Sequence, residues 1–201
     1  MLHVDRRARK GYSARALTIA LTIEHGPHRG IARQEISRRI QRMIGDLQLK
    51  KMEVSFVLTN DKRVHELNRI YRRKDRPTDV LAFAMQEGEF AALAEGVLGD
   101  VIVSVETARK QALSRSIAVL EEVTMLLAHG LLHLLGHDHD TDAKDRRMRA
   151  ETERLCEVAR GQAPRRKTSS KASRPAAAAD KGKKRQRSLA QSAKGRTARP
   201  R

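Results

Sequence analysis

The chain has 201 residues, a length that suits one domain with an appendage. Its net charge of +18 is uneven, because residues 161–201 contain fourteen Lys or Arg and one acid and so carry +13, which leaves +5 for residues 1–160. A single cysteine excludes an intrachain disulfide framework, and no apolar run reaches the roughly 18 residues that a membrane span needs. We therefore expect a cytoplasmic protein that does not enter a membrane.

Strand-like and helix-like patterns alternate in the first half of the chain. Residues 1–15 form a basic lead-in. After them, apolar residues alternate as in a strand and then recur every three or four positions as in a helix. A second strand-like pattern and a second helix-like pattern follow. Asn60 or Asp61 is suited to cap the second helix. These patterns predict strands over 16–23 and 54–58 and helices over 31–47 and from about 60 to 70.

The second half begins with a charged loop and ends in helices. Residues 71–79 and the acidic stretch 86–96 indicate loops, residues 80–83 and 98–105 predict strands, and three helices are expected over 105–114, 118–135 and 140–160. The fold class is therefore α+β, with a small mixed sheet of about four strands covered by four to five helices. We place the folded domain at 16–160 and a disordered basic tail at 161–201.

Histidines are concentrated at the end of the long apolar helix. His129 and His133 lie four residues apart, so their side chains share one helix face about 6 Å apart along the axis. Gly136 is suited to end the helix in a left-handed conformation, after which the chain can return His139 to the same ion. Three histidines and one open position are typical of a catalytic zinc site, so we expect one Zn²⁺ per chain at this helix end.

The neighbours of these histidines leave alternatives open. His137 is expected to be an exposed bystander, and Asp138 either orients an imidazole or is a solvated turn carboxylate. Metalloproteases that share the four-residue histidine spacing have a glutamate base after the first histidine, where this chain has Gly130. Peptide hydrolysis is therefore disfavoured, whereas phosphodiester cleavage remains compatible with a metal ion and an arginine.

A basic loop lies upstream of the histidines. Five Lys or Arg fall within residues 69–76, next to Tyr71. Such a loop suits a phosphate backbone and a stacked base, although a solvated charged loop has the same composition.

Three segments together resemble one family. The segment 129–139 resembles the H-G-x-L-H-L-x-G-x-D-H signature of the YbeY family of bacterial ribosomal-RNA maturation factors. Residues 67–83 resemble that family's L-N-x-x-Y-R-x-x-D-x-P-T-D-V-L-x-F stretch, and residues 98–101 resemble its L-G-D-V strand. The order and spacing agree, and the resemblance covers about residues 16–160.

The resemblance implies a single-strand-specific, metal-dependent endoribonuclease that acts in 16S rRNA 3′-end maturation and ribosome quality control. It implies zinc bound by His129, His133 and His139, and it places the family's functional arginine at Arg72. A guanidinium there is expected to hold the scissile phosphate. The partners would be single-stranded RNA, the 16S rRNA precursor and the ribosome. The charge of the basic tail, and not the resemblance, predicts that the tail also contacts nucleic acid, although a solvated tail has the same composition.

The chain departs from the family pattern at three places. Residues 82–84 read Ala-Phe-Ala where the family often has Ser-Phe-Pro, His137 replaces an aromatic residue, and the tail has no counterpart. No general base is evident, so attack by an activated water and attack by the neighbouring 2′-OH both stay open. Two other functions also stay open, a non-catalytic zinc-containing ribosome-assembly factor and, less favoured, a metalloprotease.

Overall fold

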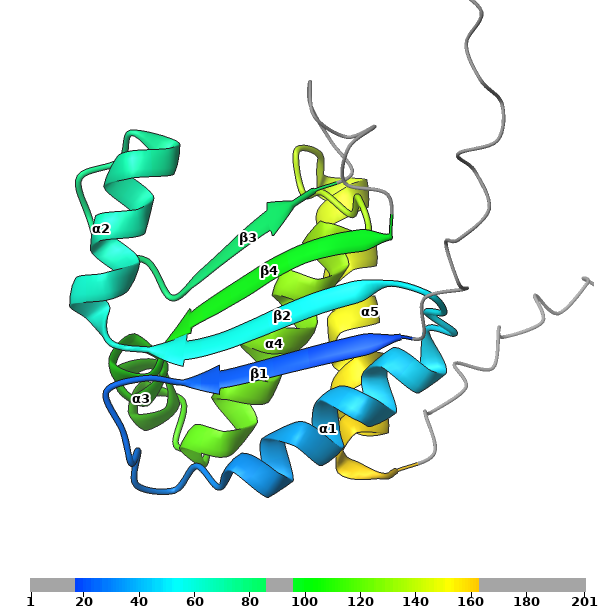
Figure 1. Ribbon diagram of the computed structural model, residues 1–201, viewed down its shortest axis with the longest axis horizontal. Coiled ribbons are helices and arrows are strands. Elements are labelled where there is room, and N and C mark those ends of the chain that lie inside the picture. Colours follow the sequence, from blue (N-terminus) through cyan, green and yellow to red (C-terminus); the bar gives the residue numbers. More distant parts are fainter. Residues whose placement is uncertain (1–16, 86–95, 163–201) are drawn as a thin grey trace, which may run out of the picture. The chain divides into compact units, whose positions relative to one another are not determined.

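Helices and strands alternate along the part of the chain that the computed structural model describes, residues 17–85 and 96–162 (Figure 1). The elements are β1 (Thr18–Ile23), α1 (Arg33–Asp46), β2 (Glu53–Thr59), α2 (Asp61–Arg72), β3 (Val80–Ala84), β4 (Val97–Ser104), α3 (Val105–Ser114), α4 (Val119–Leu134) and α5 (Asp142–Arg160). The predicted α+β class is confirmed. The predicted lead-in over 1–15, the acidic loop apart from Gly96, and the tail beyond residue 162 lie outside the described residues.

The four strands form one mixed sheet in the order β1-β2-β4-β3. The first three strands in this order are parallel, whereas β3 runs antiparallel to β4 at the edge. The sheet is therefore mixed as predicted, and β3 leaves one side of its backbone unpaired in the sheet.

One face of the sheet carries the main core. Residues of β2 alternate between the faces, and Val54, Phe56 and Leu58 point to the covered side, where they are buried. Figure 1 shows α1, α4 and α5 along this face, and their buried apolar residues join the same cluster. Among them α4 is apolar nearly all round, as a helix between a sheet and other helices must be.

The opposite face is only partly covered, by α2. Val64 and Leu67 of this helix pack with Leu81, Phe83 and Ile102 in a small second cluster. Asn60 caps the helix by accepting a hydrogen bond from the Arg63 amide at 2.9 Å, as predicted. Because α2 and α4 lie on opposite faces of the same edge of the sheet, their C-terminal ends can meet around β3.

Asp61 fixes the first turn of α2 to its neighbours. Its carboxylate accepts hydrogen bonds from Ser104, from Thr107 at 2.6 Å and from Lys110 at 2.9 Å. Burial alone would raise the pKa of Asp61, but these hydrogen bonds outweigh it and lower the pKa to about 2. The helix that carries Arg72 therefore starts from a charged anchor on β4 and α3.

No single helix in the described residues is long and apolar enough to cross a membrane. Helices α3 and α4 meet the length and composition criteria only as a pair that is bent by 117°.

Candidate active site

The end of α4 presents two histidines on one side of the helix. The ring centres of His129 and His133 are 4.8 Å apart, and the two rings are nearly perpendicular. The four-residue spacing produces this contact because it brings side chains one turn apart onto the same face. Both residues are partly buried at the helix end.

Gly136 ends the helix in the manner that the sequence predicts. It adopts a φ of 80°, a left-handed conformation that glycine tolerates without strain. Its amide donates to the carbonyl oxygen of His133, and the amide of His137 donates to that of Leu132, both at 3.0 Å. This paired arrangement is a Schellman motif, and it reverses the chain so that residues 137–139 return towards the helix end.

The reversal brings His139 to the other two histidines. Its ring centre lies 5.2 Å from that of His133 and 6.1 Å from that of His129. The carboxylate of Asp138 accepts the His139 amide at 2.7 Å and lies 3.3 Å from its Nδ1. Asp138 is thus placed to orient the His139 ring. The close contacts between histidine rings in the described residues involve His129, His133 and His139 and do not include His137.

The three histidines are close together but do not form a completed metal centre. Within residues 17–85 and 96–162, no group of three or more His, Cys, Asp or Glu side chains already has the geometry to hold a metal ion. The exposure of His139, whose side chain is 54% accessible, leaves its ring room to turn. The predicted metal role of the three residues stays a prediction.

The histidine cluster favours uncharged imidazoles. Burial lowers the pKa of His129 below 6.5, and the neighbouring His133 and His139 lower it further. Burial, then His139 and then Arg72 lower the pKa of His133. Because a metal ion binds the neutral ring, these shifts keep the two rings in the ligand form at neutral pH.

Arg72, at the end of α2, contacts the edge strand β3. Its Nη2 donates to the carbonyl oxygen of Ala82 at 3.2 Å, on the unpaired side of the edge strand β3. The positive charge of Arg72 lowers the pKa of His133, so the arginine is within electrostatic range of this predicted ligand. The other basic residues between 69 and 76, at the end of α2 and in the loop that follows it, are exposed.

Two further residues beside Arg72 were missed by the reading of the sequence. Phe83 and Asp100 are directly opposite each other on β3 and β4, and both line a cavity that Arg72 also lines. No local pattern could reveal this pair, because it depends on the register between two strands. Both residues fall within the segments that resemble the YbeY family, but the resemblance implied a role for neither of them.

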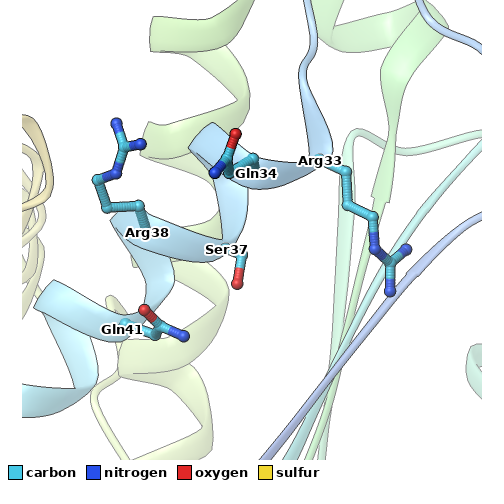
Figure 2. A pocket seen from close by; sticks show the side chains of 5 residues that line it. All are labelled: Arg33, Gln34, Ser37, Arg38 and Gln41. Carbon is cyan, nitrogen blue, oxygen red and sulfur yellow. The ribbon is translucent and has the colours of Figure 1, made fainter.

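A hollow on the outer face of α1 is a poorer candidate. Arg33, Gln34, Ser37, Arg38 and Gln41 line it, all from one helix (Figure 2). The side chains of Arg33 and Arg38 point in opposite directions, and each already has a protein partner. This surface contains no histidine and lies along the β1 side of the sheet, away from the β3 edge (Figure 1).

Comparison with known proteins identifies the family. The profile described as "Endoribonuclease YbeY" matches residues 23–160, which is more than half of the chain. The chain belongs to the YbeY family. YbeY of Syntrophotalea carbinolica is 41% identical over 122 residues, covering 60% of this chain and 81% of the relative. YbeY of Geobacter sulfurreducens is 39% identical over 136 residues, covering 67% and 90%.

A solved structure supports the fold. The solution structure of TM1509 from Thermotoga maritima matches with a TM-score of 0.51 and 23% identity, covering 72% of this chain and 90% of that protein. The YbeY profile spans the three histidines, Arg72 and the strands β2, β3 and β4, but of β1 it includes only the last residue, Ile23. Membership of the YbeY family supports an endoribonuclease role for the chain.

Proposed function

We propose that this chain is a single-strand-specific, zinc-dependent endoribonuclease that acts in the cytoplasm on the 16S rRNA precursor, in 3′-end maturation and ribosome quality control. One observation carries the proposal: His129 and His133 of α4 lie close to His139, and the charge of Arg72, an α2 residue hydrogen-bonded to β3, acts on this cluster. Family membership supports RNA as the substrate. The ribosomal context comes from the motif resemblance.

The ring separations fit one tetrahedral ion. Three imidazoles that bind one zinc through nitrogen at ~2 Å place their ring centres roughly 5 Å apart. The separations of 4.8 and 5.2 Å are close to this value, whereas the 6.1 Å between His129 and His139 is longer. His129, His133 and His139 would hold the ion after small ring rotations, and the ion would supply a Lewis acid beside the phosphate.

Arg72 is suited to hold the scissile phosphate. A planar guanidinium can donate two parallel hydrogen bonds to phosphate oxygens and stabilise the charge that develops on them. Among the described residues it donates to Ala82 alone, which leaves further N–H donors available for a phosphate. The neighbouring exposed Lys and Arg would guide the backbone of the strand. Both the activated water and the 2′-OH remain candidate nucleophiles.

The close packing at Gly130 disfavours the metalloprotease alternative relative to the nuclease. An added Cβ at this position would lie 2.5 Å from Cγ1 of Val101, so the position faces the sheet and has no room for a glutamate. The metalloprotease alternative thus lacks its base at the place where the motif requires it.

The first experiment measures bound zinc and cleavage of a labelled single-stranded RNA in parallel. We expect about one zinc per wild-type chain, loss of zinc and cleavage in His133→Ala, and retained zinc with at least ~100-fold slower cleavage in Arg72→Ala. His25→Ala and Arg63→Ala, which alter exposed residues outside the site, are the matched controls.

The outcomes separate the alternatives. Equal cleavage by all five proteins would assign the activity to a contaminant. Zinc binding without cleavage by the wild type would favour the assembly factor with a structural metal. Cleavage that survives complete zinc removal would contradict the metal dependence.

A further inference from the structure

A cavity of about 570 Å³ lies beside Arg72 on the partly covered face of the sheet. Its wall combines apolar and polar groups, among them Tyr71, Arg72, Phe83 and Asp100. This volume falls within the range of small-molecule and cofactor sites. The cavity lies on the face of the sheet opposite to α4, and Arg72 in its lining acts electrostatically on His133 of that helix.

Two aromatic rings form one corner of the cavity. The ring centres of Tyr71 and Phe83 are 5.3 Å apart at an angle of 64°. Tyr71 is 66% exposed, so its ring is accessible to a ligand. Exposed aromatic rings beside basic residues are how proteins stack the unpaired bases of single-stranded RNA.

Asp100 gives the cavity a selective polar group. It is directly opposite Phe83 across the β3–β4 pair, so both side chains are on the same face of the sheet. Its carboxylate makes no hydrogen bond or ion pair with another described residue. An ionised carboxylate only accepts hydrogen bonds, so its two oxygens require a ligand with donors.

Among the RNA bases, guanine matches this requirement best. Its N1–H and N2–H donors are adjacent and can meet both oxygens of one carboxylate. Adenine, cytosine and uracil each present a single donor that is flanked by an acceptor, which the carboxylate would repel. Charge-assisted paired hydrogen bonds of this kind are strong and directional.

We propose that this cavity binds a guanine base of the single-stranded RNA substrate, stacked on Tyr71 and read by Asp100. The proposal rests on the proposed nuclease function, because Arg72 lines the cavity and also acts on His133. A phosphate held by Arg72 therefore has the guanosine as its immediate neighbour. The exposed cations of the 69–76 loop favour RNA over an apolar peptide as the occupant.

The test measures binding without cleavage. The full chain, stripped of metal, is titrated with the trinucleotides UGU, UAU, UCU and UUU, and amide and aromatic NMR shifts are followed. We expect UGU to bind roughly tenfold more tightly than the others, as a paired base contact confers. Tyr71→Leu should weaken all four ligands alike.

Two variants that each remove one negative charge isolate the role of Asp100. Asp100→Asn should abolish the preference for UGU. Glu53→Gln, at an exposed position of β2 outside the cavity, should retain it. The wild-type comparison needs no variant, so a failure of Asp100→Asn to fold would still leave the proposal testable.

The results distinguish the two proposals. Equal binding of all four ligands, or no binding of any, would overturn the guanine pocket, even if the metal-loaded protein cleaves RNA. A preference for UGU that Asp100→Asn keeps would also overturn it. An Asp100-dependent preference for UGU in a protein that cleaves no RNA would support the pocket and overturn the nuclease function.

Discussion

The partial burial of His129 and His133 favours metal binding, but it makes protonation of these two residues at low pH costly. Their partial burial lowers both pKa values, which suits metal binding, but it also means that protonation places charge in a poorly solvated cluster. His139 and Arg72 add further positive charge close by. The same contacts that prepare the site should therefore make it sensitive to acid.

The metal-free protein should lose stability as the pH falls below 6.5. The folded-state pKa values of His129 and His133 lie below the unfolded value, so the unfolded chain binds protons first. The contribution to the free energy of unfolding is complete above pH 6.5 and is lost as the pH falls through the lowered values. Urea denaturation at pH 7.5 and at pH 5.0 measures the change.

His133→Ala provides the comparison for the pH series. It removes one of the two shifted groups and relieves repulsion in the cluster, so its stability should fall less between the two pH values than that of the wild type. Equal losses in the two proteins would show that the cluster does not cause the pH dependence.

At the level of elements, α4 lies unusually close to the sheet where Gly130 faces β4. A methyl group at Gly130 would meet Val101 Cγ1 at 2.5 Å and Val80 Cγ2 at 3.2 Å. Because both valines are on paired strands, neither can move freely. The close approach places the C-terminal turn of α4, with its two histidines, directly beneath the β3–β4 pair.

Gly130→Ala should therefore destabilise the protein by about 1–3 kcal/mol, the usual cost of overpacking a core. Gly45→Ala is the matched control, since Gly45 is in α1 and an added Cβ there meets nothing within 4 Å. That change should stabilise the protein by about 0.5–1 kcal/mol. The midpoints of urea denaturation measure both effects, and a neutral Gly130→Ala would contradict the proposed close packing.

Local sequence patterns predicted the helices and strands well, because buried apolar residues recur at regular spacing along each element. The helix at Val105–Ser114 has the predicted bounds, and Gly136 ends α4 in the left-handed conformation expected of it. The other predicted strands and helices agree within a few residues at each end, since terminal turns depend on caps such as Thr141 rather than on apolar spacing.

Long-range arrangement could not be predicted in the same way. The order β1-β2-β4-β3, and the fact that α2 and α4 cover opposite faces, follow from packing between distant segments. Arg72 was chosen by resemblance, and only the fold places it beside His133. Phe83 and Asp100 meet through a strand register that no single segment encodes.

For the whole molecule, the charge distribution suggests that the described site provides specificity for RNA and that the basic tail provides general attraction to it. The described site offers few and directed groups: three histidines, one arginine and one aromatic corner. Residues 163–201 lie outside the described part of the chain, but their composition gives them fourteen Lys or Arg against one acid. Charges of this kind bind phosphates with little regard to sequence, and salt weakens them strongly.

Removing residues 163–201 should lower RNA affinity at low salt without changing the rate of cleavage at saturating RNA. Each phosphate contact that the tail makes with a single strand adds about −0.7 to the slope of log K against log salt, so the truncated protein should show a shallower slope. Fluorescence anisotropy between 50 and 300 mM salt measures both affinities, and the two curves should converge as salt rises. An unchanged slope in the truncated protein would mean that the tail is solvated and does not contact RNA. A lower cleavage rate at saturating RNA would mean that the tail takes part at the site itself.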